Sequence, residues 1–508
     1  MTRRPNILLI TADQWRGDSL GCAGHPTLKT PNVDALAKQG TLFTRHFAAT
    51  APCSPARASL YTGLYQMNHR VIWNGSPLDA RFDTIALAAR RAGYRPTLFG
   101  YTDTAPDPRR LAPEDPALLT YEGVLPGFEV GQILPEDDGP WLNWLKERGY
   151  GEEDLAAIHH VETEPGERVS LKPAKYGANE TQTAFLTDKF LDWLAGQETG
   201  QPWFAHVSFL RPHPPLCAPA PYNTLYDPED DAGFEGTETA GEEAAFHPLV
   251  KALQHTQKIS SHIPGADGLV RDLGRRDLKR IRALYHGMIS EVDTQLGRLL
   301  EGLRTSGMDE DTVIFFTSDH AEMMGDHWML GKGGFYPQSY HIPLVIRLPG
   351  AKAGQTCEAF TSATDIFPTL AALMGIAPEH APDGQSLLPI LQGEAPEASR
   401  TSAVFEYDFR NLAVRPEGIE EGAKSGLSVL CLQTQDWLYV HCPTLPPVLM
   451  KTGAAERHQN LADDPAHRDV LMDCQSRLLS TRMRLNDETL SQKLVWEFYP
   501  EPPQSRPS

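Results

Sequence analysis

Short apolar runs alternate with helical patterns along the first two-thirds of the chain. Residues 6–11, 97–99, 204–209 and 313–316 are short, largely apolar runs, typical of strands that are buried on both faces of a sheet. Residues 281–303 repeat apolar side chains at helical spacing, and residues 31–40 and 85–93 carry helix start and stop signals. This alternation predicts an α/β fold with a large, mostly parallel sheet sandwiched by helices.

A different pattern follows residue 390. Leu427, Val429 and Cys431 alternate with polar residues, and residues 437–442 follow a short turn, which predicts a hairpin of a small antiparallel sheet. We therefore expect an α/β domain over residues 1–390 and a C-terminal α+β subdomain over residues 391–508, whose tail from residue 497 extends without packed structure. Residues 220–275 form an acidic insertion, within which we expect residues 227–243 to be a solvated lid or interface loop.

The charge balance excludes several classes of partner. The chain has 46 Lys and Arg against 66 Asp and Glu, a formal net charge of −20. Nucleic acid and anionic membranes bind basic surfaces, so we expect neither as a partner, whereas a local field can still attract a small anionic substrate.

No segment approaches the roughly 18 apolar residues of a membrane span, and the start of the chain does not read as a signal peptide. The seven cysteines contain no CxxC pair, so we expect a cytoplasmic protein without a disulfide framework or a structural zinc site.

Polar side chains follow four of the predicted strands. They are, in chain order, Asp13 and Gln14, Tyr101, His213, and Asp319 and His320. The carboxyl ends of parallel strands form the active-site crevice of an open sheet, so these side chains are expected to converge. Taken singly, Asp13 could cap a helix and His320 could be a core histidine, but their shared placement favours a functional site.

Part of this set is a suitable shell for one divalent cation. Asp13 and Asp319 offer carboxylates, Gln14 an amide oxygen and His320 an imidazole. The imidazole favours a transition metal such as manganese. Calcium stays open, because ligand types alone do not decide the metal.

Cys53 stands where a loop enters a predicted helix, with Pro55 near the first turn. The N-terminus of a helix stabilises an anion, and Arg57 lies one turn further on, facing the same site. A buried free thiol is the alternative for an isolated cysteine.

Residues 53–57 read C-S-P-A-R and match the C-x-P-x-R signature of type I sulfatases, in the alkaline phosphatase superfamily. Matching segments lie in family order before and after it, at residues 13–14, 317–320, 325–327, 365–370, 383–388 and 460–465. Nearly the whole chain resembles this family. With Gln14 and Tyr101 it most resembles the phosphonate monoester hydrolase branch and the arylsulfatase relatives of that branch. The resemblance implies an alkaline phosphatase-like fold, conversion of Cys53 to a formylglycine that joins the metal site, and a formylglycine-generating enzyme as the maturation partner.

The resemblance also implies roles for individual residues. Cys53, Arg57, His213 and Lys332 would be catalytic, with Lys332 bridging nucleophile and substrate oxygens and His213 facing the leaving group as a candidate acid. Asn74, Tyr101 and Asp103 would bind substrate. Asp103 departs from the pattern, because sulfatases often have histidine there and the phosphonate enzymes threonine, and an ionised Asp103 would disfavour a dianionic substrate.

The sequence thus predicts a metal-dependent hydrolase of sulfate monoesters and of phosphonate monoesters or phosphodiesters. One alternative is a superfamily phosphodiesterase or phosphomutase with an unmodified nucleophile, which would place Ser or Thr at position 53. A second is a binding protein without catalysis, which would have lost a metal ligand or Lys332. A P-loop over residues 325–332 is excluded, because Gly333 replaces the required Ser or Thr.

We expect a homo-oligomer, a dimer or tetramer, because the acidic insertion and the tail resemble assembly elements.

Overall fold

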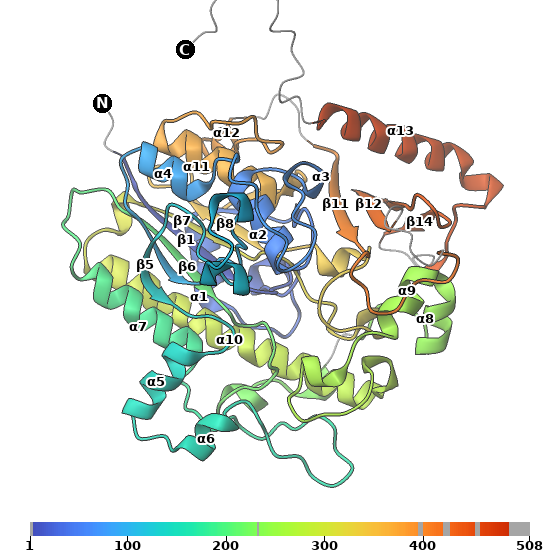
Figure 1. Ribbon diagram of the computed structural model, residues 1–508, viewed down its shortest axis with the longest axis horizontal. Helices are drawn as coiled ribbons and strands as arrows, with labels where there is room; N and C mark the ends of the chain where they lie inside the picture. Colours follow the sequence, from blue (N-terminus) through green and yellow to red (C-terminus); the bar gives the residue numbers. More distant parts are fainter. Residues whose placement is uncertain (1–3, 231–232, 395–399, 420–426, 453–457, 487–508) are drawn as a thin grey trace, which may run out of the picture.

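The computed structural model describes residues 4–230, 233–394, 400–419, 427–452 and 458–486. Its centre is an eight-stranded sheet with the strand order β5-β4-β6-β1-β7-β8-β2-β9 (Figure 1). β8 runs antiparallel to both of its neighbours, and the other pairs are parallel. The mostly parallel sheet is therefore confirmed. Its strands are β1 (Asn6–Ala12), β2 (Thr41–Phe43), β4 (Pro96–Gly100), β5 (Glu129–Ile133), β6 (Phe204–Phe209), β7 (Thr312–Thr317), β8 (Leu344–Arg347) and β9 (Gln355–Cys357).

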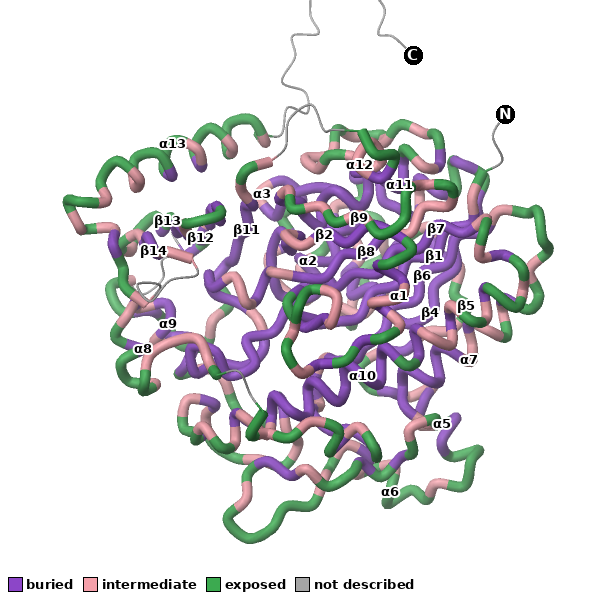
Figure 2. The backbone as a smooth tube through the Cα atoms, turned by 180° about the vertical axis from the view of Figure 1, so that it is seen from behind, coloured by how far each residue is buried: buried purple, intermediate pink, exposed green. Residues whose placement is uncertain are grey.

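Both faces of the sheet are covered, and Figure 2 shows the buried central strands. In β1, Leu8 and Ile10 enter one apolar core, whereas Ile7 and Leu9 enter a second core on the opposite face. This alternation follows from the strand period of two. The first core is covered by α1 (Pro31–Gln39), α7 (Gln182–Leu194) and α10 (Arg275–Thr305), and the second by α2 (Cys53–Thr62), α4 (Ile85–Arg91) and α11 (Ile366–Met374).

The three helices predicted from the sequence are present as α1, α4 and most of α10. Thr30 precedes α1, but its hydroxyl donates to Asp34 Oδ1 at 3.0 Å and does not cap the helix backbone. None of the helices that the structure describes combines the length and the apolar character that a membrane span requires. The remaining helices are α3 (Gln66–His69), α5 (Gly139–Glu147), α6 (Glu152–Ala156), α8 (Ala240–Phe246), α9 (Pro248–Gln254), α12 (Leu388–Leu391) and α13 (Arg468–Arg484).

A second, four-stranded antiparallel sheet lies toward the C-terminus, as predicted. It consists of β11 (Ser402–Asp408), β12 (Ser428–Thr434), β13 (Trp437–His441) and β14 (Val448–Lys451). Helix α13 packs on one face through Cys474 and Leu478. The other face shares a core with the large domain, where Phe405 stacks on Tyr340 with ring centroids 4.2 Å apart. A small parallel pair, β3 (His46–Phe47) with β10 (Thr361–Ser362), lies beside this core, and the predicted tail from residue 497 lies outside the described residues.

The acidic insertion is more ordered than its composition suggests. Helix α8 begins with a capping box between Thr239 and Glu242. Glu243 is buried, its Oε1 lies 2.8 Å from His327 Nδ1, and the same oxygen accepts a hydrogen bond from the Tyr336 hydroxyl at 2.7 Å. The expectation of a solvated loop over residues 227–243 is therefore wrong at its C-terminal end. A buried carboxylate is tolerated there because it is paired.

The pH dependence of stability tests the packing of the second sheet. Glu406 in β11 is buried, and its Oε1 accepts the backbone N–H of Met67 at 3.1 Å. Burial raises the pKa of Glu406 from 4.5 to about 8. The folded protein therefore keeps this proton up to about pH 8, whereas the unfolded chain loses it near pH 4.5, so the free energy of unfolding falls as the pH rises through this window.

We expect Glu406→Gln to remove this contribution. Urea unfolding should show that the free energy of unfolding decreases less between pH 5 and pH 8 in this variant than in the wild type. The two decreases should differ by more than about 1 kcal/mol. The matched variant Glu310→Gln, at an exposed site, should lose as much unfolding free energy between the two pH values as the wild type. Equal losses in the wild type and Glu406→Gln would contradict the role of Glu406 in this pH dependence.

Candidate active site

The register of the sheet brings the two predicted carboxylates together. β1 and β7 are parallel neighbours in which Thr11 pairs with Thr317. Asp13 and Asp319 each stand two residues beyond that pair, so both emerge at the same edge of the sheet. β6 adjoins β1 on its other side and pairs Ser208 with Thr11, which adds a hydroxyl at this edge.

Four of the five predicted metal ligands form one buried group. One donor atom from each of Asp13, Cys53, Asp319 and His320 lies within 4.8 Å of the others. His320 Nε2 is 3.2 Å from Cys53 Sγ and 3.6 Å from Asp13 Oδ1. Among the described residues, Asp13 Oδ1 has no hydrogen-bond partner although it is buried. A buried carboxylate oxygen needs a compensating charge or donor, so this donor set fits a bound cation.

Gln14, the fifth predicted ligand, borders this group and has a positive φ of 67°. Its Oε1 accepts a hydrogen bond from Lys332 Nζ at 2.7 Å, and its Nε2 donates to Glu322. Glu322 also accepts the backbone N–H groups of Met324, at 2.9 Å, and of Gly331, at 2.6 Å. Glu322 therefore holds Gln14 and the residue before Lys332 in place. Sequence reasoning did not select it, although it lies only two residues after His320.

Arg57 lies behind the two carboxylates. Its Nε donates to Asp319 Oδ2 at 3.0 Å and its Nη2 to Asp13 Oδ2 at 3.1 Å, while Nη1 donates to Ser208 Oγ at 2.8 Å. The predicted position one turn after Cys53 is correct. All three guanidinium nitrogens contact protein groups, so Arg57 neutralises the two carboxylates.

Tyr101 and Asn74, which are predicted to bind substrate, make hydrogen bonds to other residues of the site. The Tyr101 hydroxyl donates to Asp13 Oδ2, and the Arg57 guanidinium lies 4.1 Å from the centroid of the Tyr101 ring. Asn74 Oδ1 accepts the backbone N–H of Ser54 at 3.0 Å, in the first turn of α2. Both side chains therefore fix the geometry around Cys53 and Asp13.

Asp103 is buried, and neither of its carboxylate oxygens has a hydrogen-bond partner among the residues described. Burial raises the pKa of Asp103 well above its usual range, although Arg57, 3.9 Å away, acts in the opposite direction. Asp103 therefore holds its proton more tightly than an ordinary aspartate does. This shift opposes the negative charge by which Asp103 was expected to disfavour a dianionic substrate.

Lys332 and His213 form a hydrogen-bonded pair beside the donor group. Lys332 Nζ lies 2.9 Å from His213 Nε2, and His213 Nδ1 lies 2.7 Å from the Pro214 carbonyl oxygen. Nδ1 therefore carries the ring proton and Nε2 accepts from Lys332. Burial and the Lys332 charge lower the pKa of His213 well below its usual range. Burial also lowers the pKa of Lys332, but Cys53, Asp13 and Asp319 outweigh it and raise that pKa, so the pair consists of a cationic lysine and a neutral histidine.

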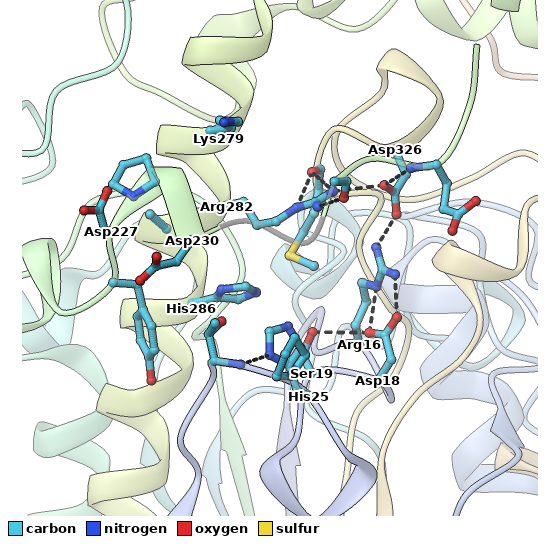
Figure 3. Close-up of a pocket in the computed structure, with 18 of the residues that line it drawn as sticks. Arg16, Asp18, Ser19, His25, Asp227, Asp230, Lys279, Arg282, His286 and Asp326 are labelled. Atoms are coloured by element: carbon cyan, nitrogen blue, oxygen red, sulfur yellow. Dashed lines mark hydrogen bonds and ion pairs between the residues drawn. The ribbon is translucent and has the colours of Figure 1, made fainter. Parts of the chain in front are cut away.

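A separate cavity of about 320 Å³ flanks the site, and none of the four clustered donor residues lines it (Figure 3). Asp326 connects two other residues that line the cavity. Its Oδ2 accepts a hydrogen bond from Arg16 Nη1 at 2.6 Å, and its Oδ1 accepts one from Arg282 Nη2 at 2.9 Å. These contacts connect the segment after β1, helix α10 and the loop after β7. The segments that carry Gln14 and Lys332 are thereby held together.

A family model for sulfatases matches residues 5–376. The chain belongs to the sulfatase family. The crystal structure of a phosphonate monoester hydrolase from Agrobacterium radiobacter superposes on this sulfatase with a TM-score of 0.92 and 52% identity, covering 97% of this chain and 98% of that one. A multifunctional alkaline phosphatase superfamily protein, PehA of Trinickia caryophylli, is 38% identical over 97% of both chains, and an arylsulfatase of Clostridium perfringens is 30% identical over 77% of this chain and 79% of its own. The predicted resemblance and the alkaline phosphatase-like fold are confirmed.

The hydrogen bond from Tyr101 to Asp13 predicts an effect on metal affinity. Tyr101→Phe removes a donor from a buried carboxylate oxygen, and losing such a supporting contact typically weakens metal binding about 10- to 100-fold. We expect a weakening of this size in calorimetric titrations of metal-free protein with Mn²⁺. The control is Tyr61→Phe, whose hydroxyl contacts Arg57 Nη1 at 3.4 Å, and it should bind Mn²⁺ like the wild type. Equal weakening in both variants would refute the role of Tyr101.

Proposed function

We propose that this chain hydrolyses sulfate monoesters, as an arylsulfatase does, and phosphonate monoesters and phosphodiesters, through a formylglycine derived from Cys53. The observation that carries the proposal is the place of Cys53 Sγ, at the start of α2 and within the buried group of Asp13, Asp319 and His320. One divalent cation would be held by these residues with Gln14. Manganese is favoured over calcium because His320 offers an imidazole.

The charge of the site favours a monoanionic transferring group. Lys332 is the cation beside the donor group, whereas Arg57 is engaged with the carboxylates. Within the described ranges, no second group of three or more His, Cys, Asp or Glu side chains has metal-ligand spacing. A phosphate monoester dianion would favour a second metal, so sulfate monoesters, phosphonate monoesters and phosphodiesters fit this site better.

The reaction follows from the groups that surround Cys53. A bound metal would lower the pKa of a nearby hydroxyl and stabilise the charge on a substrate oxygen. One hydroxyl of a formylglycine hydrate at position 53 would attack sulfur or phosphorus and the bond to the leaving oxygen would break, while Lys332 and the N-terminus of α2 offset the negative charge of the transferring group. Lys332 Nζ, which donates to His213 Nε2, would supply a proton to the leaving oxygen. Loss of the second hydroxyl proton would then re-form the aldehyde and release sulfate, phosphonate or, from a phosphodiester, the phosphate monoester.

The alternative of a phosphodiesterase with an unmodified nucleophile would require Ser or Thr at position 53, where this chain has Cys53. Maturation by a formylglycine-generating enzyme and residence in the cytoplasm complete the proposal. Assembly into a dimer or tetramer is also proposed. It is supported by exposed apolar side chains at helical spacing on α13, namely Met472, Leu479 and Met483.

The modification of Cys53 is tested by mass spectrometry of the peptide that contains it. Active protein should contain the aldehyde in place of the thiol, and Cys53→Ala should abolish turnover while the fold is kept. Cys431→Ala, at a buried cysteine of the second sheet, should keep turnover. Fully active protein that carries only the Cys53 thiol would contradict the proposal.

The substrate class is tested by kcat/KM for matched aryl esters in the metal-loaded protein. We expect turnover of the sulfate monoester, the phosphonate monoester and the phosphodiester, and weaker turnover of the phosphate monoester. Chelation of the metal should abolish all four activities, and elemental analysis should find one metal per chain. A phosphate monoester that is the best substrate by about tenfold, or about 1.4 kcal/mol of transition-state stabilisation, would overturn the assignment.

A further inference from the structure

A second set of reactive side chains lies outside the site described above. Cys217 Sγ is 3.9 Å from His159 Nδ1, and His159 Nε2 is 2.7 Å from Asp138 Oδ2. Cys217 follows β6, His159 follows α6 and Asp138 precedes α5, so three separate segments build the group. A thiol, an imidazole and a carboxylate in this order form the arrangement that activates a cysteine.

A guanidinium and a hydroxyl lie beside the sulfur. Arg211 Nη2 lies 3.9 Å and the Tyr176 hydroxyl 3.6 Å from Cys217 Sγ. Burial raises the pKa of the Cys217 thiol, but His159 and Arg211 outweigh it, so the pKa is lower than that of an ordinary thiol. Burial lowers the pKa of His159, but Asp138 and Cys217 outweigh it and raise that pKa. The contacts therefore favour a thiolate beside an imidazolium, which is the reactive form of cysteine.

Cys217 and His159 both line a cavity of about 280 Å³. Cys217 is only 3% exposed, so a reagent that reaches its sulfur must be small. The backbone N–H groups of Leu216 and Cys217 are already bonded to the carbonyl oxygens of His262, at 2.8 Å, and Pro215, at 2.9 Å. They are not available as an oxyanion hole, which argues against acyl transfer. A small oxidant needs no such donors.

We propose that Cys217 is a site of reversible oxidation by hydrogen peroxide. The thiolate sulfur attacks one peroxide oxygen, an S–O bond forms and the O–O bond breaks. Sulfur is oxidised by two electrons to the sulfenic acid, and peroxide is reduced. The leaving hydroxide takes the proton of the His159 imidazolium and departs as water.

The geometry links this oxidation to the catalytic loop. Arg211 begins the segment that contains His213, and its Nη1 donates to the carbonyl oxygens of Pro215 and, at 3.4 Å, of Cys217. An oxygen added to the sulfur introduces a hydrogen-bond acceptor beside Arg211 Nη2 and the Tyr176 hydroxyl, and so changes the contacts that Arg211 makes. Because Arg211 holds the loop that places His213 against Lys332, oxidation is expected to lower the turnover of the proposed function until a thiol reductant restores it.

Labelling of the full-length, metal-loaded protein tests the site independently of turnover. Samples exposed for a short, varied time to sub-millimolar hydrogen peroxide are then unfolded in the presence of dimedone, so that burial does not block the label. Cys217 should be labelled about tenfold faster over the exposure time than Cys431, whose pKa is raised by burial. His159→Gln should lower the rate of Cys217 labelling by about tenfold. His160→Gln, at a neighbouring histidine that lines the same cavity, should leave it unchanged. Labelling no faster than that of Cys431, or unaffected by His159→Gln, would overturn the site.

Turnover of an aryl ester by the same samples tests the link to the catalytic loop. Peroxide should lower wild-type turnover severalfold, and dithiothreitol should restore it. Cys217→Ser should have wild-type turnover before peroxide and keep it afterwards. Loss of turnover in Cys217→Ser after peroxide, or labelling of wild-type Cys217 without loss of turnover, would overturn the link. A protein without turnover in any sample would contradict the proposed function, while the labelling still decides the oxidation site.

Discussion

The buried ion pairs between Arg57 and the carboxylates of Asp13 and Asp319 are the interaction on which the rest of the site depends. Two carboxylates in a water-excluded site are costly unless each has a partner, and a guanidinium is suited to this because its fork donates to both at once. Cys53 and Arg57 are four residues apart in α2 and so share one face of the helix. The same ion pairs that make the carboxylates tolerable therefore also fix Cys53 relative to them.

The close approach of the strands makes this arrangement possible. Gly100, at the end of β4, has φ +115°, and a Cβ added there would lie 2.0 Å from the Ser208 carbonyl oxygen. Glycine at this position allows the close approach of β4 and β6 just beyond their last pair, Phe99 with Val207, and the following residue, Tyr101, lies against the Arg57 guanidinium. Backbone geometry, as well as charge, thus determines which group reaches Asp13.

Residues at strand ends were predictable because the carboxyl ends of parallel strands lie at one edge of the sheet, and each strand is recognisable from a pattern that is local in sequence. Asp13, Asp319 and His320 belong to this class. Arg57 was predictable for another local reason, because it lies one helical turn after Cys53. The partners of Arg57 and the contacts of Tyr101 were not predictable, because they depend on which rotamers fill a core assembled from distant segments. Glu243 shows the same limit: its acidic surroundings suggest solvent, but its partner His327 lies 84 residues away. The metal preference and the role of Asp103 also require the three-dimensional environment.

The second sheet contributes to the active site, although its residues lie far along the chain. Gly333, which follows Lys332, has φ +122°, and a Cβ added there would lie 2.8 Å from the Tyr407 ring of β11. The loop that carries Lys332 therefore packs directly against β11. The same strand reaches the segment before Cys53 through the bridge between Thr50 and Glu406. The predicted boundary near residue 390 separates two sheets in sequence, but the segments that place Lys332 and Cys53 pack against both, so formation of the active site depends on the docking of the second sheet.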